Sequence, residues 1–96
     1  MRIERVNISP AVADKLARKH SLSAKEVYEV FWNEEERALI YKSDRMPGTY
    51  VALGRTEAGR YLAVAFAPQT KGQARVITAR DMTKAERQLY RRERKR

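Results

Sequence analysis

The chain has 96 residues, and its 21 lysines and arginines against 12 aspartates and glutamates give a formal net charge of +9 with its one histidine neutral. A chain of this length can bury one hydrophobic core but not two, so we expect a single domain over residues 1–96. No apolar run is long enough to span a membrane and no signal peptide is recognisable at the start, which predicts a cytoplasmic protein.

The first third of the chain predicts a short strand followed by two amphipathic helices. Residues 2–6 alternate as a strand does. Ser9 precedes a proline, and this pair is typical of a helix start because the serine oxygen accepts a free amide bond, which predicts a helix over 10–20. Ser23 and Glu26 have the spacing of a capping box and open a second short helix. We expect the two helices to form a helical hairpin.

The middle of the chain predicts four strands. One covers residues 37–43, two form a β-hairpin over 49–56 and 60–67 around a glycine-containing loop, and the last covers 74–80. Large and small side chains alternate in the hairpin, so we expect the small ones to share a shallow face. These small residues are Ala52, Gly54, Ala63 and Ala65.

The chain ends in a strongly basic segment. Thr83 and Glu86 form another capping box, which predicts a helix or tail at about 83–96. From residue 84 onward there are seven lysines and arginines and two glutamates, so this segment carries more than half of the net charge. The predicted fold is therefore a small α+β domain with the order β-α-α-β-β-β-β-α.

The basic segment has several interpretations. It is typical of a surface that binds RNA phosphates by releasing counterions, or of one that binds an acidic protein. A solvated helix end that complements its own dipole, or that simply keeps the protein soluble, would have the same composition. The sequence leaves these alternatives open.

Arg55 and Arg80 each fall at the end of a predicted strand. A guanidinium on such a rigid frame can hold a phosphate through two hydrogen bonds. The alternative is a surface ion pair, for instance with Glu57 or Asp81.

His20 and Tyr90 are the remaining candidates for chemistry. His20 titrates near neutrality and could be a general acid or base, but a histidine at the end of a helix also complements the helix dipole. Tyr90 could be a catalytic residue or stack on a base, although a half-buried helix residue is the simpler interpretation. The chain has no cysteine and one histidine, so disulfides and thiolate sites are excluded and we expect no metal and no cofactor.

These residues together resemble the BrnT family of toxins, which are similar in fold to the RelE and ParE toxin superfamily. The resemblance covers nearly the whole chain, and its last segment is the most specific part. The segments that carry it are Arg18-Lys19-His20, Val27–Phe31, Leu53-Gly54-Arg55-Thr56, Val76-Ile77-Thr78-Ala79-Arg80, and Thr83-Lys84-Ala85-Glu86-Arg87 with Tyr90.

The resemblance implies a type II toxin that cleaves RNA without a metal, inhibits translation and is neutralised by a ribbon-helix-helix antitoxin of the BrnA kind. It implies that His20 or Lys19 moves protons, that Arg55 and Arg80 hold the phosphate, and that Tyr90 or Arg87 borders the site. The implied RNA-binding residues are Arg18, Arg87, Arg91 and Arg92.

This hypothesis requires Arg55, Arg80 and His20 to line one cationic hollow. The alternative is a non-catalytic module of the same fold that binds RNA or a protein.

Overall fold

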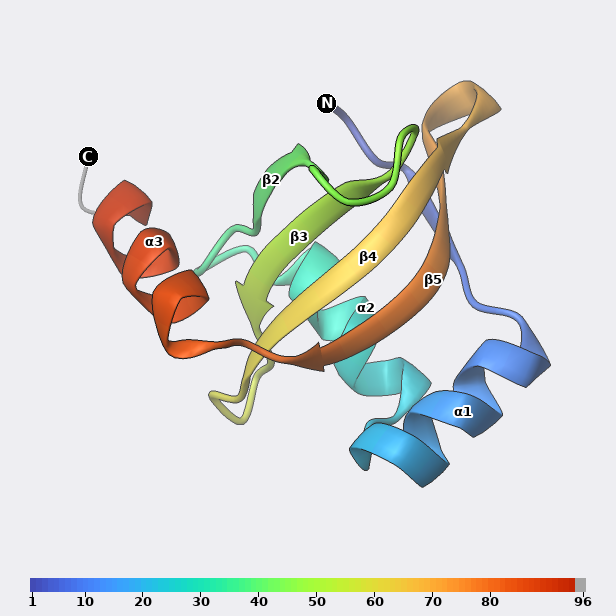
Figure 1. Cartoon of the computed structure of the whole chain (residues 1–96), viewed down its shortest axis with the longest axis horizontal. Coiled ribbons are helices and arrows are strands. Elements are labelled where there is room, and N and C mark those ends of the chain that lie inside the picture. The colour runs from blue at the N-terminus through green and yellow to red at the C-terminus, as the bar shows by residue number, and fades with distance from the viewer. Residues whose placement is uncertain (95–96) are drawn as a thin grey trace.

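The computed structural model describes residues 1–94, which form three α-helices, one short 3₁₀ turn and a single five-stranded sheet (Figure 1). The sheet order is β1-β5-β4-β3-β2, and β1 is parallel to β5 while the other pairs are antiparallel. The strands are β1 Arg5–Asn7, β2 Leu39–Lys42, β3 Tyr50–Arg55, β4 Tyr61–Gln69 and β5 Gln73–Asp81. The helices are α1 Pro10–His20, α2 Ala24–Trp32 and α3 Lys84–Arg94.

The predicted class and element order are confirmed. Between the predicted strands 60–67 and 74–80 we expected a loop, but β4 continues to Gln69 and β5 begins at Gln73, so only the 3₁₀ turn Thr70–Gly72 separates them. The predicted tail residues Lys95 and Arg96 lie outside the described residues. Among the described residues, no helix is both long and apolar enough to cross a bilayer.

The three predicted caps are all present as hydrogen bonds. Ser9 Oγ accepts from the backbone N–H of Val12 at 3.1 Å. Ser23 exchanges both capping-box bonds with Glu26. The backbone N–H of Thr83 donates to Glu86 at 2.8 Å, and Thr83 Oγ1 accepts from the N–H of Glu86 at 3.1 Å. Short-range patterns therefore fix where each helix begins.

The expectation of one small-residue face in the β-hairpin is wrong. The connection Thr56–Arg60 sets a register in which Leu53 lies opposite Ala63 and Ala52 lies opposite Val64. Cross-strand neighbours point to the same face, so each face combines large side chains from one strand with small ones from the other. Both faces of the hairpin therefore carry large apolar side chains that other elements must cover.

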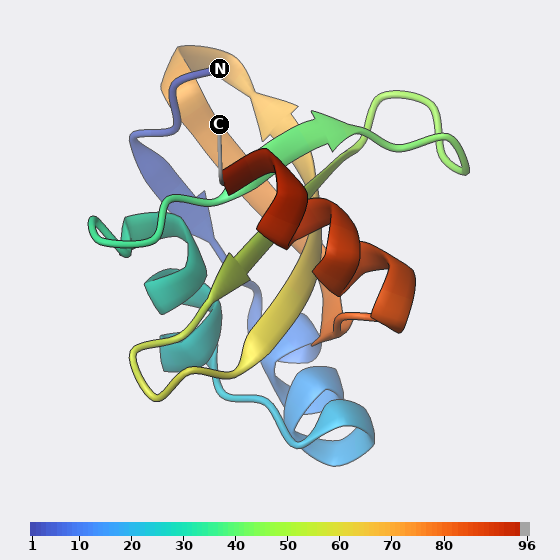
Figure 2. The same cartoon turned by 90° about the vertical axis from the view of Figure 1, so that its left-hand side faces the viewer.

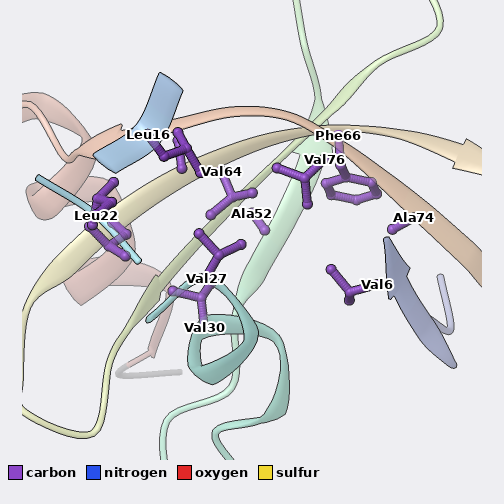
Figure 3. Close-up of a cluster of buried hydrophobic side chains, with 12 residues drawn as sticks. Val6, Leu16, Leu22, Val27, Val30, Ala52, Val64, Phe66, Ala74 and Val76 are labelled. Carbon is purple, nitrogen blue, oxygen red and sulfur yellow. The ribbon is translucent and has the colours of Figure 1, made fainter. Parts of the chain in front are cut away.

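Helices α1 and α2 cover one face of the sheet, and α3 covers the other (Figure 2). The larger core lies under α1 and α2 (Figure 3). Its Phe66 contacts Phe31 edge to face, with the ring centres 5.5 Å apart. Its buried members are Val6, Leu16, Leu22, Val27, Val30, Ala52, Leu62, Val64, Phe66, Ala74, Val76 and Ala79. The smaller core lies under α3 and consists of Leu53, Ala63, Met82 and Tyr90.

At Gly54 of β3, Val30 of α2 lies directly against the backbone of the sheet. A β-carbon at this position would lie 2.8 Å from Val30 Cγ1 and 3.3 Å from the Val30 carbonyl oxygen. Because that space is filled, Gly54→Ala is expected to lower the free energy of unfolding by about 1–2 kcal/mol. Urea titration would measure this loss, and an unchanged midpoint would contradict the packing described here.

Candidate functional site

Three arginines surround the ring of Tyr61 on the face of the sheet that α3 covers. The guanidinium carbon lies 4.7 Å from the ring centre for Arg55, 4.5 Å for Arg87 and 5.5 Å for Arg91. Arg55 is the cross-strand partner of Tyr61, and Arg87 and Arg91 lie one turn apart on α3. We call these four residues the tyrosine–arginine cluster. Cation–π contacts hold its charged groups around one aromatic surface.

The cluster has an excess of positive charge. Within residues 1–94 no ion pair joins Arg87 or Arg91 to a carboxylate. A hydrogen bond from Arg91, together with the charges of Arg55, Arg91 and Arg87, lowers the pKa of Tyr61 against the opposing effect of partial burial. The lowered pKa shows that the surroundings of Tyr61 favour a negative charge on its hydroxyl oxygen. The same surroundings favour a bound anion.

Tyr90 lies beneath the cluster. It is 1% exposed, and its ring meets that of Tyr61 edge to face at 6.1 Å. Burial raises the pKa of Tyr90, and its hydroxyl has no hydrogen-bond partner among the described residues. A side chain so deeply buried packs α3 against the sheet and supports the ring above it. The structure thus places Tyr90 under the site.

Glu36 links Arg55 to α3. Its Oε1 accepts from Arg55 Nη1 at 3.1 Å and also from Arg94 Nη1. Arg55 Nε also donates to the carbonyl oxygen of Gly59 in the hairpin turn, at 3.3 Å. The ion pair foreseen for Arg55 therefore exists, but its partner is Glu36 and not Glu57. A contact between residues so far apart in the chain has no local sequence signal.

Arg80 lies on the other side of α3 from Arg55. Its two terminal nitrogens donate to the two carboxylate oxygens of Glu86 at 2.6 and 3.0 Å, a bidentate pair. Arg80 and Glu86 line a cavity of about 420 Å³ together with Tyr41. The ion pair considered for Arg80 was with the Asp81 side chain. At Asp81, however, Arg80 donates to the backbone carbonyl oxygen, and its ion pair is with Glu86. Glu86 thus both caps α3 and fixes Arg80.

The Arg80 hydrogen bond is the main cause that lowers the pKa of Glu86 from its ordinary value of 4.5. A carboxylate with a lowered folded-state pKa stabilises the protein above 4.5, and this contribution is lost as the pH falls through the folded-state pKa. Glu86→Gln is therefore expected to cost about 1 kcal/mol of unfolding free energy near neutral pH and almost nothing in acid. Urea titrations at about pH 7 and pH 3 would measure this, and an equal loss at both pH values would contradict it.

Arg60 is the centre of a network that sequence reasoning missed. Its Nε and Nη2 donate to the two carboxylate oxygens of Asp81 at 2.7 and 3.1 Å. It also donates to the carbonyl oxygens of His20 and Ser21, at 3.1 and 3.0 Å, and lies 3.5 Å from Glu26. One guanidinium therefore caps the end of α1 and ties it to β5 and α2.

The remaining predicted residues lie apart from the cluster. His20 and Lys19 end α1, on the face opposite to α3, and Arg18 of the same helix pairs with Asp14 at 2.9 Å. Arg92 is exposed on α3, 3.9 Å from its neighbour Glu93. Of the predicted residues, the structure brings together Arg55, Arg87 and Arg91 around Tyr61, with Tyr90 below.

The expectation of a single hollow lined by Arg55, Arg80 and His20 is wrong. Arg55 lines a cavity between α2 and the hairpin turn, Arg80 lines a different one, and His20 lines neither. His20 is separated from both arginines because α1 packs on the face of the sheet away from α3 (Figure 2). No group of three or more histidines or carboxylates among residues 1–94 could hold a metal ion.

Comparison with known proteins supplies an independent finding. The chain matches the sequence profile of the family "Ribonuclease toxin, BrnT, of type II toxin-antitoxin system" over residues 10–86. Among solved structures it is similar to the Brucella abortus ribonuclease toxin BrnT, with a TM-score of 0.66 and 20% identity over 83% of this chain and 97% of that one. At this level of identity the likeness shows a shared fold. A search of curated proteins found no match.

Proposed function

The chain belongs to the family of BrnT ribonuclease toxins of type II toxin-antitoxin systems, and from this premise we propose that it cleaves RNA at the tyrosine–arginine cluster. The observation that carries the proposal is the convergence of Arg55, Arg87 and Arg91 on the ring of Tyr61. Guanidinium groups bind phosphates and an aromatic surface supports a base, so the cluster has what a single-stranded RNA requires.

The chemistry of cleavage needs three actions from the protein. In the reaction we propose, the protein takes the proton of the RNA 2′-hydroxyl while its oxygen bonds to the adjacent phosphorus, stabilises the crowded phosphate, and gives a proton to the 5′-oxygen as its bond to phosphorus breaks, which forms a 2′,3′-cyclic phosphate without a metal. Arg87 and Arg91, which lack carboxylate partners within residues 1–94, would stabilise the crowded phosphate. Tyr61, whose pKa is lowered chiefly by a hydrogen bond from Arg91, would accept the proton of the 2′-hydroxyl and return it to the leaving 5′-oxygen.

The distant residues have supporting parts in this proposal. Arg92 on α3, Arg80 at the end of β5, and Arg18, Lys19 and His20 at the end of α1 lie outside the cluster, and in this proposal they would contact other phosphates of a longer RNA. The family implies an antitoxin encoded beside the toxin, and we propose one of the ribbon-helix-helix BrnA kind that covers α3. Cleavage of cytoplasmic RNA would then inhibit translation until the antitoxin returns.

An RNA-cleavage assay tests the proposal. We expect the purified chain to cut a single-stranded RNA in the presence of EDTA, to leave 2′,3′-cyclic phosphate ends, and to stop growth when it is expressed alone. A 2′-O-methyl RNA of the same sequence is the control, because its blocked 2′-oxygen cannot attack the phosphorus. Intact RNA under all conditions would refute ribonuclease activity.

The alternative function is a binding module without turnover. Arg55 and Arg80 were predicted to hold the phosphate, but each already pairs with a carboxylate, and this observation favours the alternative. Salt-sensitive binding of both the RNA and its 2′-O-methyl form, with neither one cut, would identify this alternative.

A further inference from the structure

Glu36 is held in a fixed position at the border of the tyrosine–arginine cluster. The side-chain oxygen of Asn33 accepts the backbone N–H groups of Glu35 and Glu36 at 3.1 and 3.0 Å. The side-chain amide of the same Asn33 donates to the carbonyl oxygen of Arg55 at 3.1 Å. The turn that carries Glu36 is therefore tied to the end of β3, and its carboxylate has a defined place.

The contacts of that carboxylate imitate those of a phosphate. A single oxygen, Oε1, accepts from the guanidinium of Arg55 and from that of Arg94. The side chain of Glu36 is 22% exposed, while Arg55 and Arg94 are 30% and 39% exposed. An anion from solution can therefore reach both guanidinium groups, although the internal anion already holds them.

Charge balance explains why such a group is present. Arg55, Arg87, Arg91 and Arg94 all lie around the rings of Tyr61 and Tyr90. Four like charges at this spacing repel one another, and one carboxylate between two of them reduces the repulsion in the free protein. A bound RNA phosphate would provide the same compensation from outside.

We propose that Glu36 is an autoinhibitory residue that occupies Arg55 and Arg94 in the free protein and is displaced by an RNA phosphate. This inference rests on the proposed RNA-binding function and adds to it the residue that sets its affinity. The carboxylate competes with RNA for the same guanidinium groups, so it weakens binding although it lies at the site. Its removal strengthens binding.

The test is the affinity of the Glu36→Gln variant for a 2′-O-methyl RNA, measured by fluorescence anisotropy. The matched control is Glu57→Gln, which makes the same change in net charge two residues from Arg55. Glu57 is exposed and forms no ion pair within residues 1–94. We expect Glu36→Gln to bind about three- to tenfold more tightly than Glu57→Gln, because only the first change frees Arg55 and Arg94.

The possible outcomes are distinct. If both variants bind alike, or if Glu36→Gln binds more weakly than Glu57→Gln while its circular dichroism remains native, Glu36 does not compete with RNA and the inference is overturned. If the unaltered chain and both variants fail to bind RNA at low salt, the proposed function itself is overturned. A lower melting temperature of Glu36→Gln combined with tighter binding supports the inference, since the carboxylate then stabilises the free state.

Discussion

Replacing Arg87 and Arg91 together by glutamine is expected to weaken RNA binding by about 10- to 100-fold at moderate salt. Both guanidinium groups contact the ring of Tyr61, and neither is held by a carboxylate within the described residues. Their charges are therefore available to phosphates, and each phosphate contact releases counterions. The slope of the logarithm of affinity against the logarithm of salt concentration should fall by about two.

The matched control is Arg5→Gln with Arg75→Gln, which removes the same net charge. Both residues are exposed on the paired strands β1 and β5, at the opposite edge of the sheet from β2. We expect this control to change the affinity by less than about threefold, as a purely long-range effect would. Equal losses in the two double variants would mean that total charge, and not the cluster, determines binding.

Replacing Arg60 by methionine is expected to lower the free energy of unfolding by about 2–4 kcal/mol. The change breaks the bidentate pair with Asp81 and leaves the carbonyl oxygens of His20 and Ser21 without this donor. Methionine keeps most of the apolar stem, so the loss reports the hydrogen bonds and not the packing. Urea unfolding followed by circular dichroism measures it.

The control for this substitution is Arg45→Met, in the exposed loop between β2 and β3, which makes the same chemical change. We expect it to alter stability by less than about 0.5 kcal/mol, as surface changes usually do. A similar stability of the two variants would show that the Arg60 network is a surface contact of little energy.

Elements that depend on short-range patterns could be predicted from the sequence. Ser9, Ser23 and Thr83 each supply a capping oxygen within a few residues of the amides they bind, and all three helices begin as predicted. The β-hairpin was likewise recognisable from its glycine-containing connection. Such features need no knowledge of the rest of the chain.

The features that could not be predicted depend on register and on the choice of face. Tyr61 has no distinctive sequence neighbours, and its importance follows from its position opposite Arg55 and under α3. Glu36 pairs with Arg94, which lies 58 positions further along the chain. His20 was grouped with the strand-end arginines because the sequence does not show that α1 packs on the other face.

The first and the last strand of the described chain pair at one edge of the sheet. Strand β1 pairs with the beginning of β5, where Arg5 lies opposite Gln73 and the N–H of Glu4 donates to the carbonyl oxygen of Gly72. During synthesis β1 leaves the ribosome before all the other strands of the sheet, and its partner strand β5 is the last of them to emerge. Because α3 directly follows β5, a nascent chain completes its sheet and gains Arg87 and Arg91 at almost the same moment. Incomplete chains would therefore carry neither a closed sheet nor the arginines proposed to hold RNA.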